Sequence, residues 1–238
     1  STYAGNIANV IGTPTTPKTT SLVVNSGNLT LTGGFTAQNI TVNSGGILTI
    51  GAGGGDGIWP ASNLITINSG GTLKFTGDNR IKNDTVIDIP SGAGFDMNGK
   101  TDVVGHIKGA GSITNLTNTL TVSLPAVGSP AEFSGTINGA AAAVNSLVLR
   151  CDGTGASAAS TLILSGANTG MTSTAASGTV NVQGGRLIAR NTAAFGPAGQ
   201  FITVGTAALT LDPTIEYQTD TVMNAYALNI GSGNTGTI

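Results

Sequence analysis

Charged side chains that could perform acid–base chemistry gather in one part of the sequence. They are Asp78, Arg80, Lys82, Asp84 and Asp88, followed further along by Asp96, Lys100 and Asp102. Polysaccharide lyases and hydrolases use carboxylates and basic groups on one exposed face for such chemistry. An acid–base site predicts that Asp78, Asp84, Asp96 and Asp102 converge in a groove. We favour the alternative, in which the few charges of this chain occupy exposed loops and aid solubility.

The remaining candidates for chemistry are isolated. His106 is expected on the outward side of a strand in a structural role, because no serine nucleophile motif accompanies it. Residues 51–57, GAGGGDG, resemble calcium-binding Gly-Asp repeats but occur once, which favours a loop. Trp59 suits sugar stacking, a subunit contact or packing over a corner. Cys151, the single cysteine, is expected to be buried.

Four Asn-x-Thr sequences match N-glycosylation acceptors, at Asn28, Asn39, Asn83 and Asn115. In a chain this rich in Asn and Thr such matches arise by chance, so we interpret them as stacked polar residues. The sequence therefore assigns no catalytic, cofactor-binding or metal-binding residue, and predicts a protein that is not an enzyme and has no cofactor.

The composition excludes several classes of protein. Charged residues are 8% of the chain, the net charge is −2, and hydrophobic residues are 39%. This hydrophobicity argues against disorder, and the charge balance argues against binding nucleic acid or an anionic membrane by electrostatics. One Cys and one His exclude an internal disulfide, a Cys-rich zinc site and a multi-histidine metal site. No apolar run approaches the length of a transmembrane helix.

The elements that would position any site are short strands. Alternation of apolar and polar residues indicates half-buried strands, and it recurs at 29–32, 40–43, 65–68, 86–89, 120–124 and 209–211. The Ala-rich stretches 140–143 and 156–159 lack an apolar stripe at helical spacing. The fold class is therefore predicted as all-β with essentially no α-helix.

A turn motif recurs with the strands. Asn-Ser-Gly follows an apolar residue at Asn25, Asn43 and Asn68, at spacings of 18 and 25 residues, and looser copies follow. Such a period is typical of a solenoid with one coil per repeat, whereas a sandwich would show hairpin turns. We predict a single-stranded parallel β-helix of about ten or eleven coils. Stacking would place Asn over Asn, Gly at the corners and few charges or aromatic rings in a thin interior.

We expect residues 1–20 to form an extended lead-in or cap and residues 21–238 to form one continuous solenoid. A soft boundary is expected near 125–130, where two prolines interrupt the chain.

The second half of the chain resembles the autotransporter-associated β-strand repeat over residues 133–200. Residues 133–137 are FSGTI, 160–169 are STLILSGANT, 178–187 are GTVNVQGGRL and 191–196 are NTAAFG. The resemblance implies a right-handed parallel β-helix on the outside of a bacterial cell, in a secreted or surface adhesin. It supplies no catalytic residues, and the stretch 170–175 departs from the family pattern.

Two functions follow as hypotheses. The first is a non-catalytic extracellular or cell-surface protein that forms homo-oligomers or filaments through its ends or a donated N-terminal strand, or that forms part of an adhesin stalk. The alternative is a protein that binds or degrades surface glycans, as tailspikes and lyases do. Neither requires nucleic acid or a membrane span.

Overall fold

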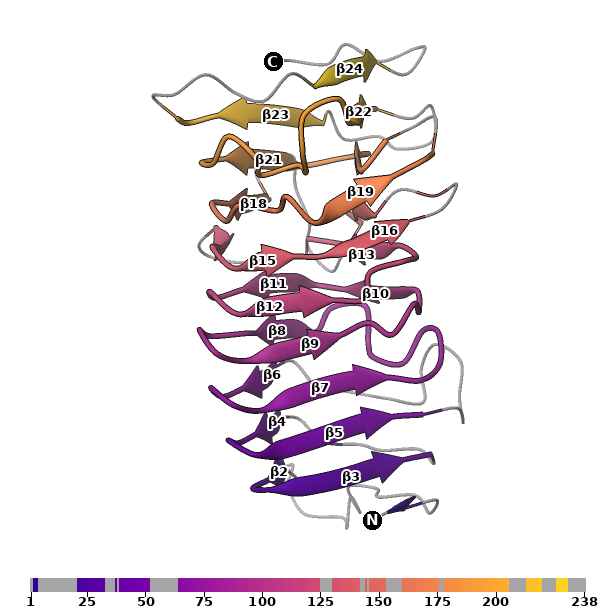
Figure 1. Cartoon of the computed structure of the whole chain (residues 1–238), viewed down its shortest axis with the longest axis vertical. Helices are drawn as coiled ribbons and strands as arrows, with labels where there is room; N and C mark the ends of the chain where they lie inside the picture. The colour runs from indigo at the N-terminus through magenta and orange to yellow at the C-terminus, as the bar shows by residue number, and fades with distance from the viewer. Residues whose placement is uncertain are drawn as a thin grey trace, which may run out of the picture.

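The computed structural model describes residues 2–3, 21–32, 37, 39–51, 64–124, 130–141, 144, 146–152, 160–175, 178–205, 213–219 and 226–230. Within these ranges there is no helix, and every strand pairing is parallel. Figure 1 shows the strands stacked as successive rungs from the N-terminal end to the C-terminal end. The predicted parallel β-solenoid is therefore confirmed, whereas the number of coils stays a prediction.

One face of the solenoid, which we call the long face, runs from the first rung to one of the last. It joins a five-stranded sheet to a four-stranded sheet through a single parallel bridge between Gly109 and Phe133. In spatial order its strands are β2 (Ser21–Val24), β4 (Asn39–Val42), β6 (Leu64–Ile67), β8 (Val86–Asp88), β11 (His106–Lys108), β14 (Ala131–Phe133), β18 (Thr161–Leu164), β21 (Arg186–Ala189) and β23 (Thr214–Tyr217).

The other sheets cover only part of the length. The seven-stranded sheet, at the N-terminal end, contains β1 (Thr2–Tyr3), β3 (Gly27–Leu31), β5 (Gly46–Ile50), β7 (Thr72–Phe75), β9 (Gly94–Asp96), β12 (Ser112–Thr114) and β15 (Thr136–Ile137). The six-stranded sheet, at the C-terminal end, contains β10 (Asp102–Val104), β13 (Leu120–Val122), β17 (Leu147–Leu149), β20 (Val180–Val182), β22 (Phe201–Val204) and β24 (Ala227–Ile230). A two-stranded sheet pairs β16 (Gly139–Ala141) with β19 (Met171–Ser173).

The core is a set of aliphatic and aromatic ladders inside the coil. In the seven-stranded sheet, each residue of the inner ladder lies in register with the next: Leu29, Leu48, Leu73, Phe95, Ile113 and Ile137. All except Leu29 are fully buried. Because side chains alternate between the two faces of a strand, their neighbours in sequence point to solvent. This alternation is the pattern that the sequence shows.

The Asn-Ser-Gly turns form the predicted polar stack at one corner. The Asn43 amide Nδ2 donates to Asn25 Oδ1 at 2.8 Å, and Asn68 Nδ2 donates to Asn43 Oδ1 at 2.7 Å. Gly27 and Gly45 in these turns have φ of 73° and 74°, a conformation that costs glycine little. The prediction of Asn over Asn with Gly at the corners is confirmed.

Most of the predicted strands coincide with observed ones, namely β3, β4, β6, β8 and β13. The predicted strand at 209–211 and residues 125–129 of the soft boundary lie outside the described residues. Of the predicted lead-in 1–20, only Thr2–Tyr3 is described, and its backbone pairs with β3. In the described part of the chain, no helix is long and apolar enough to span a membrane.

Candidate functional site

The strongest candidate for a functional surface is the pair of ends at which the core is open. Among the described residues, four hydrophobic side chains pack against the core but stay half-buried, and all lie near an end. They are Leu22 and Leu29 in the first rung, and Tyr217 and Tyr226 in the last part of the stack. The residues of the core cluster itself, including Val24 of the first rung and Ile215 of β23, are at most 5% exposed.

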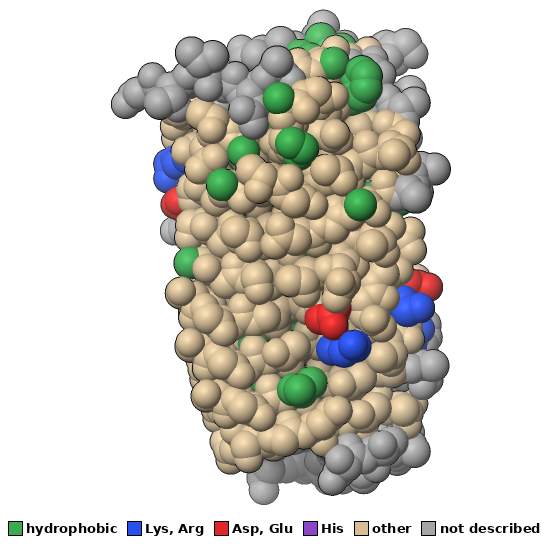
Figure 2. All heavy atoms as spheres, viewed as in Figure 1, with side chains coloured by type: hydrophobic (Ala, Val, Ile, Leu, Met, Phe, Trp, Pro, Cys, Tyr) green, Lys and Arg blue, Asp and Glu red, His purple; other side chains and the backbone are tan. Residues whose placement is uncertain are grey.

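The C-terminal end shows this opening most clearly. Leu228 and Ile230 of β24 lie in register with Ile202 and Val204 of β22, so they occupy core positions. Ile202 and Val204 are 1% and 2% exposed, whereas Leu228 and Ile230 are 39% and 46% exposed. The difference arises because no further rung covers β24 among the described residues. Figure 2 shows hydrophobic side chains gathered toward this end of the visible face.

Aromatic rings add to the apolar surface at this end. Phe195 packs edge-on against Tyr217, with ring centroids 5.7 Å apart, and lies 5.9 Å from the ring of Tyr226. The Tyr226 hydroxyl lies 3.0 and 2.8 Å from the carbonyl oxygens of Thr192 and Gly196, which share its single proton. Burial raises the pKa of Tyr217 to about 12, so its ring stays neutral. The surface is therefore uncharged at physiological pH where these rings lie.

The N-terminal end exposes strand edges. In the described part of the chain, β2 pairs only with β4, whereas the edge of β3 is covered by the short strand β1. Val23 of β2 is 50% exposed. The sequence of β2, SLVV, contains no charged residue and no proline. Such residues usually protect an exposed strand edge from pairing with another chain.

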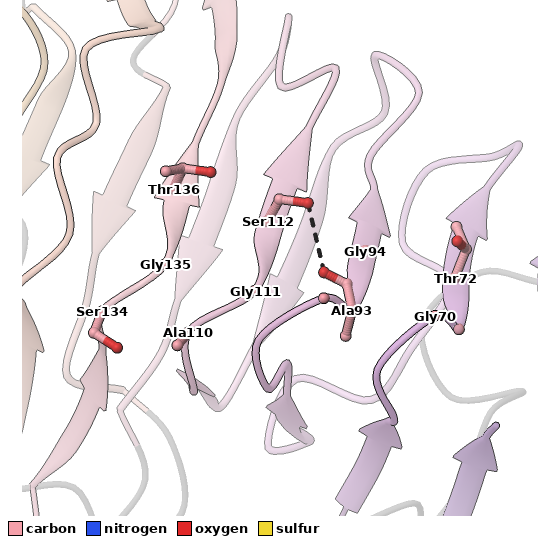
Figure 3. A pocket seen from close by; sticks show the side chains of 12 residues that line it. Gly70, Thr72, Ala93, Gly94, Ala110, Gly111, Ser112, Ser134, Gly135 and Thr136 are labelled. Atoms are coloured by element: carbon pink, nitrogen blue, oxygen red, sulfur yellow. Dashed lines mark hydrogen bonds between the residues drawn. The ribbon is translucent and has the colours of Figure 1, made fainter. Parts of the chain in front are cut away.

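A shallow groove of about 440 Å³ crosses four rungs beside the corner between the long face and the seven-stranded sheet. Glycine, alanine, serine and threonine line it, among them Thr72, Ser112 and Thr136 (Figure 3). The Ser112 hydroxyl donates to the Ala93 carbonyl at 3.5 Å, and backbone bonds, such as that from the Gly94 N–H to the Gly71 carbonyl at 3.0 Å, join the rungs along the groove. No acid, base or aromatic ring lines the groove, so it offers a ligand only hydroxyls and backbone groups.

The aspartates proposed for acid–base chemistry are distributed over several elements. Asp96, on β9 of the seven-stranded sheet, pairs with Lys74 at 3.3 Å. Asp88, on β8 of the long face, pairs with Lys108 at 2.9 Å. In a loop, Asp84 lies 3.8 Å from Lys82. None of these aspartates lines the groove.

Asp78 and Asp102 lie close together at a corner, where each binds the neighbouring rung. Asp78 Oδ1 accepts the backbone N–H of Thr101 at 2.8 Å, and Asp102 Oδ2 accepts that of Arg80 at 2.5 Å. The Asp102 side chain is fully buried, so the expectation that it occupies an exposed loop is wrong. Burial raises the pKa of Asp102 to about 7, against the opposing effect of N–H donors from Arg80 and Val103. Its role is to fasten two rungs together.

His106 begins β11 and is only 1% exposed, although the alternation along the strand places it on the outward side, opposite to the core residue Ile107. Burial lowers the pKa of His106 to about 4. Neither ring nitrogen has a hydrogen-bond partner among the described residues. A buried neutral imidazole fits the expected structural role.

The other isolated candidates give little chemistry. Cys151 is 7% exposed, which confirms the expected burial. Trp59 and residues 52–57 lie outside the described residues. In the described ranges, no three His, Cys, Asp or Glu side chains are grouped to hold a metal ion. Two of the glycosylation-like positions bond to a neighbouring rung. Asn28 Oδ1 accepts the Thr49 hydroxyl at 3.4 Å, and Asn115 Nδ2 donates to Asp96 Oδ1 at 2.9 Å.

A network of ionic and amide side chains covers the C-terminal half of the long face, and sequence reasoning missed it. Arg190 Nη1 lies 3.1 Å from Glu132 Oε2, and Arg190 Nε donates to Gln218 Oε1 at 3.0 Å. Gln218 in turn donates to Glu216, which pairs with Arg186. The only signal of this network in the sequence is the presence of acidic and basic residues in neighbouring repeats. Because the coils differ in length, spacing along the chain does not show which of these side chains lie side by side.

No known protein family, curated protein or solved structure matches this chain. The class of protein is therefore defined by the structure itself, as a parallel β-solenoid.

Proposed function

We propose that this protein is a non-catalytic structural or adhesive β-solenoid of the bacterial cell surface or extracellular space, whose copies associate end to end into filaments or a surface layer. The observation that carries the proposal is the exposure of core positions at the ends, above all Leu228 and Ile230. Covering these side chains with another rung would remove apolar surface from water, which is the main driving force of association.

The geometry of the two ends favours an open polymer. The N-terminal and C-terminal ends are different surfaces, so contact between them is heterologous, and such contacts generate filaments when the rotation does not close a ring. Unpaired backbone groups of edge strands add hydrogen bonds to the contact. A filament subunit of this kind needs no catalytic group.

The extracellular location rests on the sequence. The resemblance of residues 133–200 to the autotransporter-associated repeat implies a secreted or surface adhesin, either as a polymer or as a segment of a stalk. The low content of charged residues, 8%, suits stacked rungs, in which like charges would repel one another at every level.

Electron microscopy and sedimentation velocity of the purified chain test the proposal. We expect filaments with a regular subunit repeat, and a weight-average mass that rises with protein concentration. Isolated short rods that stay monomeric at high concentration would contradict it.

A paired substitution at Val23 strengthens the test. The Val24 carbonyl accepts the Asn43 N–H at 2.8 Å, so the backbone groups of Val24 face β4 and those of Val23 face the free edge. Val23→Pro removes an edge donor and is expected to abolish filaments, whereas the control Val23→Thr keeps the donor and is expected to assemble. Equal assembly of both variants would argue against edge pairing.

A glycan-binding function is the second candidate, and the observation that favours it is the hydroxyl-lined groove. Calorimetric titration with surface polysaccharides tests it, with Gly94→Trp as the blocking variant, since a Cβ at Gly94 meets its nearest atom at an ordinary 3.6 Å. Binding that survives this substitution would exclude the groove.

A further inference from the structure

We propose that strand pairing across the end-to-end contact is made by the long face: the edge of β23 that no described strand covers pairs in parallel with the corresponding edge of β2 in the next copy. Ile215 would lie beside Leu22, and Tyr217 beside Val24. The inference rests on the proposed function, because it names the surfaces and the register by which a second copy binds.

The distribution of the sheets selects the long face. It has a described strand in the first rung, β2, and in one of the last, β23. The six-stranded sheet ends in β24 but begins only at β10, so it presents no described strand at the N-terminal end. The seven-stranded sheet is covered by β1 at one end and stops at β15. Figure 1 shows β2 and β23 at opposite ends of the same side.

The backbone groups of the two edges are complementary. The N–H of Thr214 donates to the Gly185 carbonyl and that of Gln218 to the Ala189 carbonyl, both at 2.8 Å. Because successive residues of a strand point their backbone groups in opposite directions, those of Ile215 and Tyr217 face the edge of β23 with which no described strand pairs. On β2 the groups of Ser21 and Val23 face the edge away from β4, by the same argument from Val24. This alternation matches the hydrogen-bond pattern of a parallel pair.

The side chains agree with that pairing. Ile215 and Tyr217 lie in register with the buried Leu187 and Ala189 of β21, so they point into the core. Leu22 and Val24 lie in register with the buried Ile40 and Val42 of β4, so they do the same. Full overlap of the four-residue strands therefore continues the core from one copy to the next.

The outward side chains meet without conflict in this register. Thr214 would lie beside Ser21, and Glu216 beside Val23. Glu216 already pairs with Arg186 of its own chain, so its charge is compensated before any contact forms. A shift by one residue would turn the core side chains to solvent, and a shift by two would leave part of each edge unpaired.

Cysteine cross-linking tests the contact and its register. In a Cys151→Ala background, Ser21→Cys with Thr214→Cys places two outward thiols on facing strands, whose Cα separation of about 4.8 Å permits a disulfide. Mild oxidation with oxidised glutathione should yield a ladder of covalent multimers on non-reducing gels, with about tenfold more multimer than either single-cysteine variant. Electron microscopy of each reduced variant shows whether filaments still form.

Two matched pairs serve as controls. Val23→Cys with Thr214→Cys is offset by two residues and is expected to stay at the single-variant level. Ser21→Cys with Thr66→Cys uses an outward position of the inner strand β6, and is expected to give no multimers.

The outcomes separate this inference from the proposed function. Multimers from the Val23 pair in place of the Ser21 pair would overturn the register. Filaments that no pair cross-links would overturn the β23–β2 contact while leaving self-assembly in place. A chain that remains monomeric, as expected if a further rung of the same polypeptide is the natural occupant of these edges, would overturn both.

Discussion

The corner that follows the long face is built differently in the N-terminal and C-terminal parts of the molecule. In the N-terminal part, Gly27, Gly45 and Gly70 adopt positive φ, and each N–H donates to the glycine carbonyl of the next rung at 2.8 to 2.9 Å. In the C-terminal part, Gly135 and Gly166 lie directly against backbone. A Cβ on Gly166 would lie 1.7 Å from the carbonyl oxygen of Gly135.

This difference shows two ways of stacking rungs. The N-terminal corner repeats one turn, so each rung offers the next the same amide and the same carbonyl. The C-terminal corner brings unlike segments into close contact, and unlike side chains, Arg190 with Glu132 among them, join its rungs. Repetition gives many modest interactions, whereas close contact makes single positions critical.

The largest effect is expected from a methyl group at the C-terminal corner. Gly166→Ala forces backbone apart and should lower the free energy of unfolding by about 3 kcal/mol or more. Gly27→Ala meets nothing within 4 Å and bears only the strain of φ 73°, so it should cost about 1 kcal/mol. Urea titrations of both variants measure the difference, and equal losses would remove the proposed contrast.

A pH-dependent effect is expected from the N-terminal part, which holds Asp102 and His106. The native pKa of Asp102 is raised from 3.8 to about 7, so its contribution to stability is lost as pH rises through that range. The native pKa of His106 is lowered from 6.5 to about 4, so stability is lost as pH falls through that range. In the wild type the two slopes oppose each other between about pH 4 and 6.5.

Substitution of the histidine should reveal the slope of the aspartate. In His106→Leu, the free energy of unfolding should fall by about 1.4 kcal/mol for each unit by which the pH rises between 4 and 6.5. The free energy of unfolding of the wild type should stay nearly constant over the same range. Urea unfolding at three pH values measures both slopes. A flat profile in the variant would show that Asp102 is ionised in the native state.

The Asn stack of the N-terminal corner should respond by an amount that depends on position. Asn43→Ala removes two amide bonds and should cost about 1 to 2 kcal/mol, whereas Asn25→Ala removes one and should cost about half as much. Thermal unfolding measures the ratio. If Asn25→Ala costs as much as Asn43→Ala, the bonds along the stack do not contribute independently.

The smallest effect is expected from the ionic network of the C-terminal part. Arg190→Met removes its pairs with Glu132 and Gln218, and should cost about 0.5 kcal/mol because both partners are partly exposed. High salt should reduce the difference from wild type. A double-mutant cycle with Glu132→Gln isolates the pair, and a coupling energy well above 1 kcal/mol would place this network on a level with the corner glycines.

Several features of the fold could be predicted from the sequence because they are local and repeated. The alternation at 40–43 and 65–68 predicted β4 and β6, and the Asn-Ser-Gly spacing predicted the stacked amides of Asn25, Asn43 and Asn68. Each rung repeats the same chemistry, so one turn and one strand carry enough information to describe their neighbours.

Features of the candidate site depend on distant segments and could not be predicted. The burial of Asp102 depends on which loop of the adjacent rung covers it, and the pairing of Arg190 with Glu132 joins residues 58 positions apart. Coils of 18 and 25 residues do not keep a constant register, so counting along the chain does not locate such partners.

The sequence by itself determined that the chain is all-β, that its rungs stack in parallel and that its interior is thin and apolar, because alternation and turn chemistry act within one repeat. Only the tertiary structure decided that the long face runs from the first rung to one of the last, that Leu228 and Ile230 stay exposed at core positions, and that Asp102 and His106 are buried. Burial is a property of the neighbours that surround a side chain, and those neighbours are brought together by coils of unequal length.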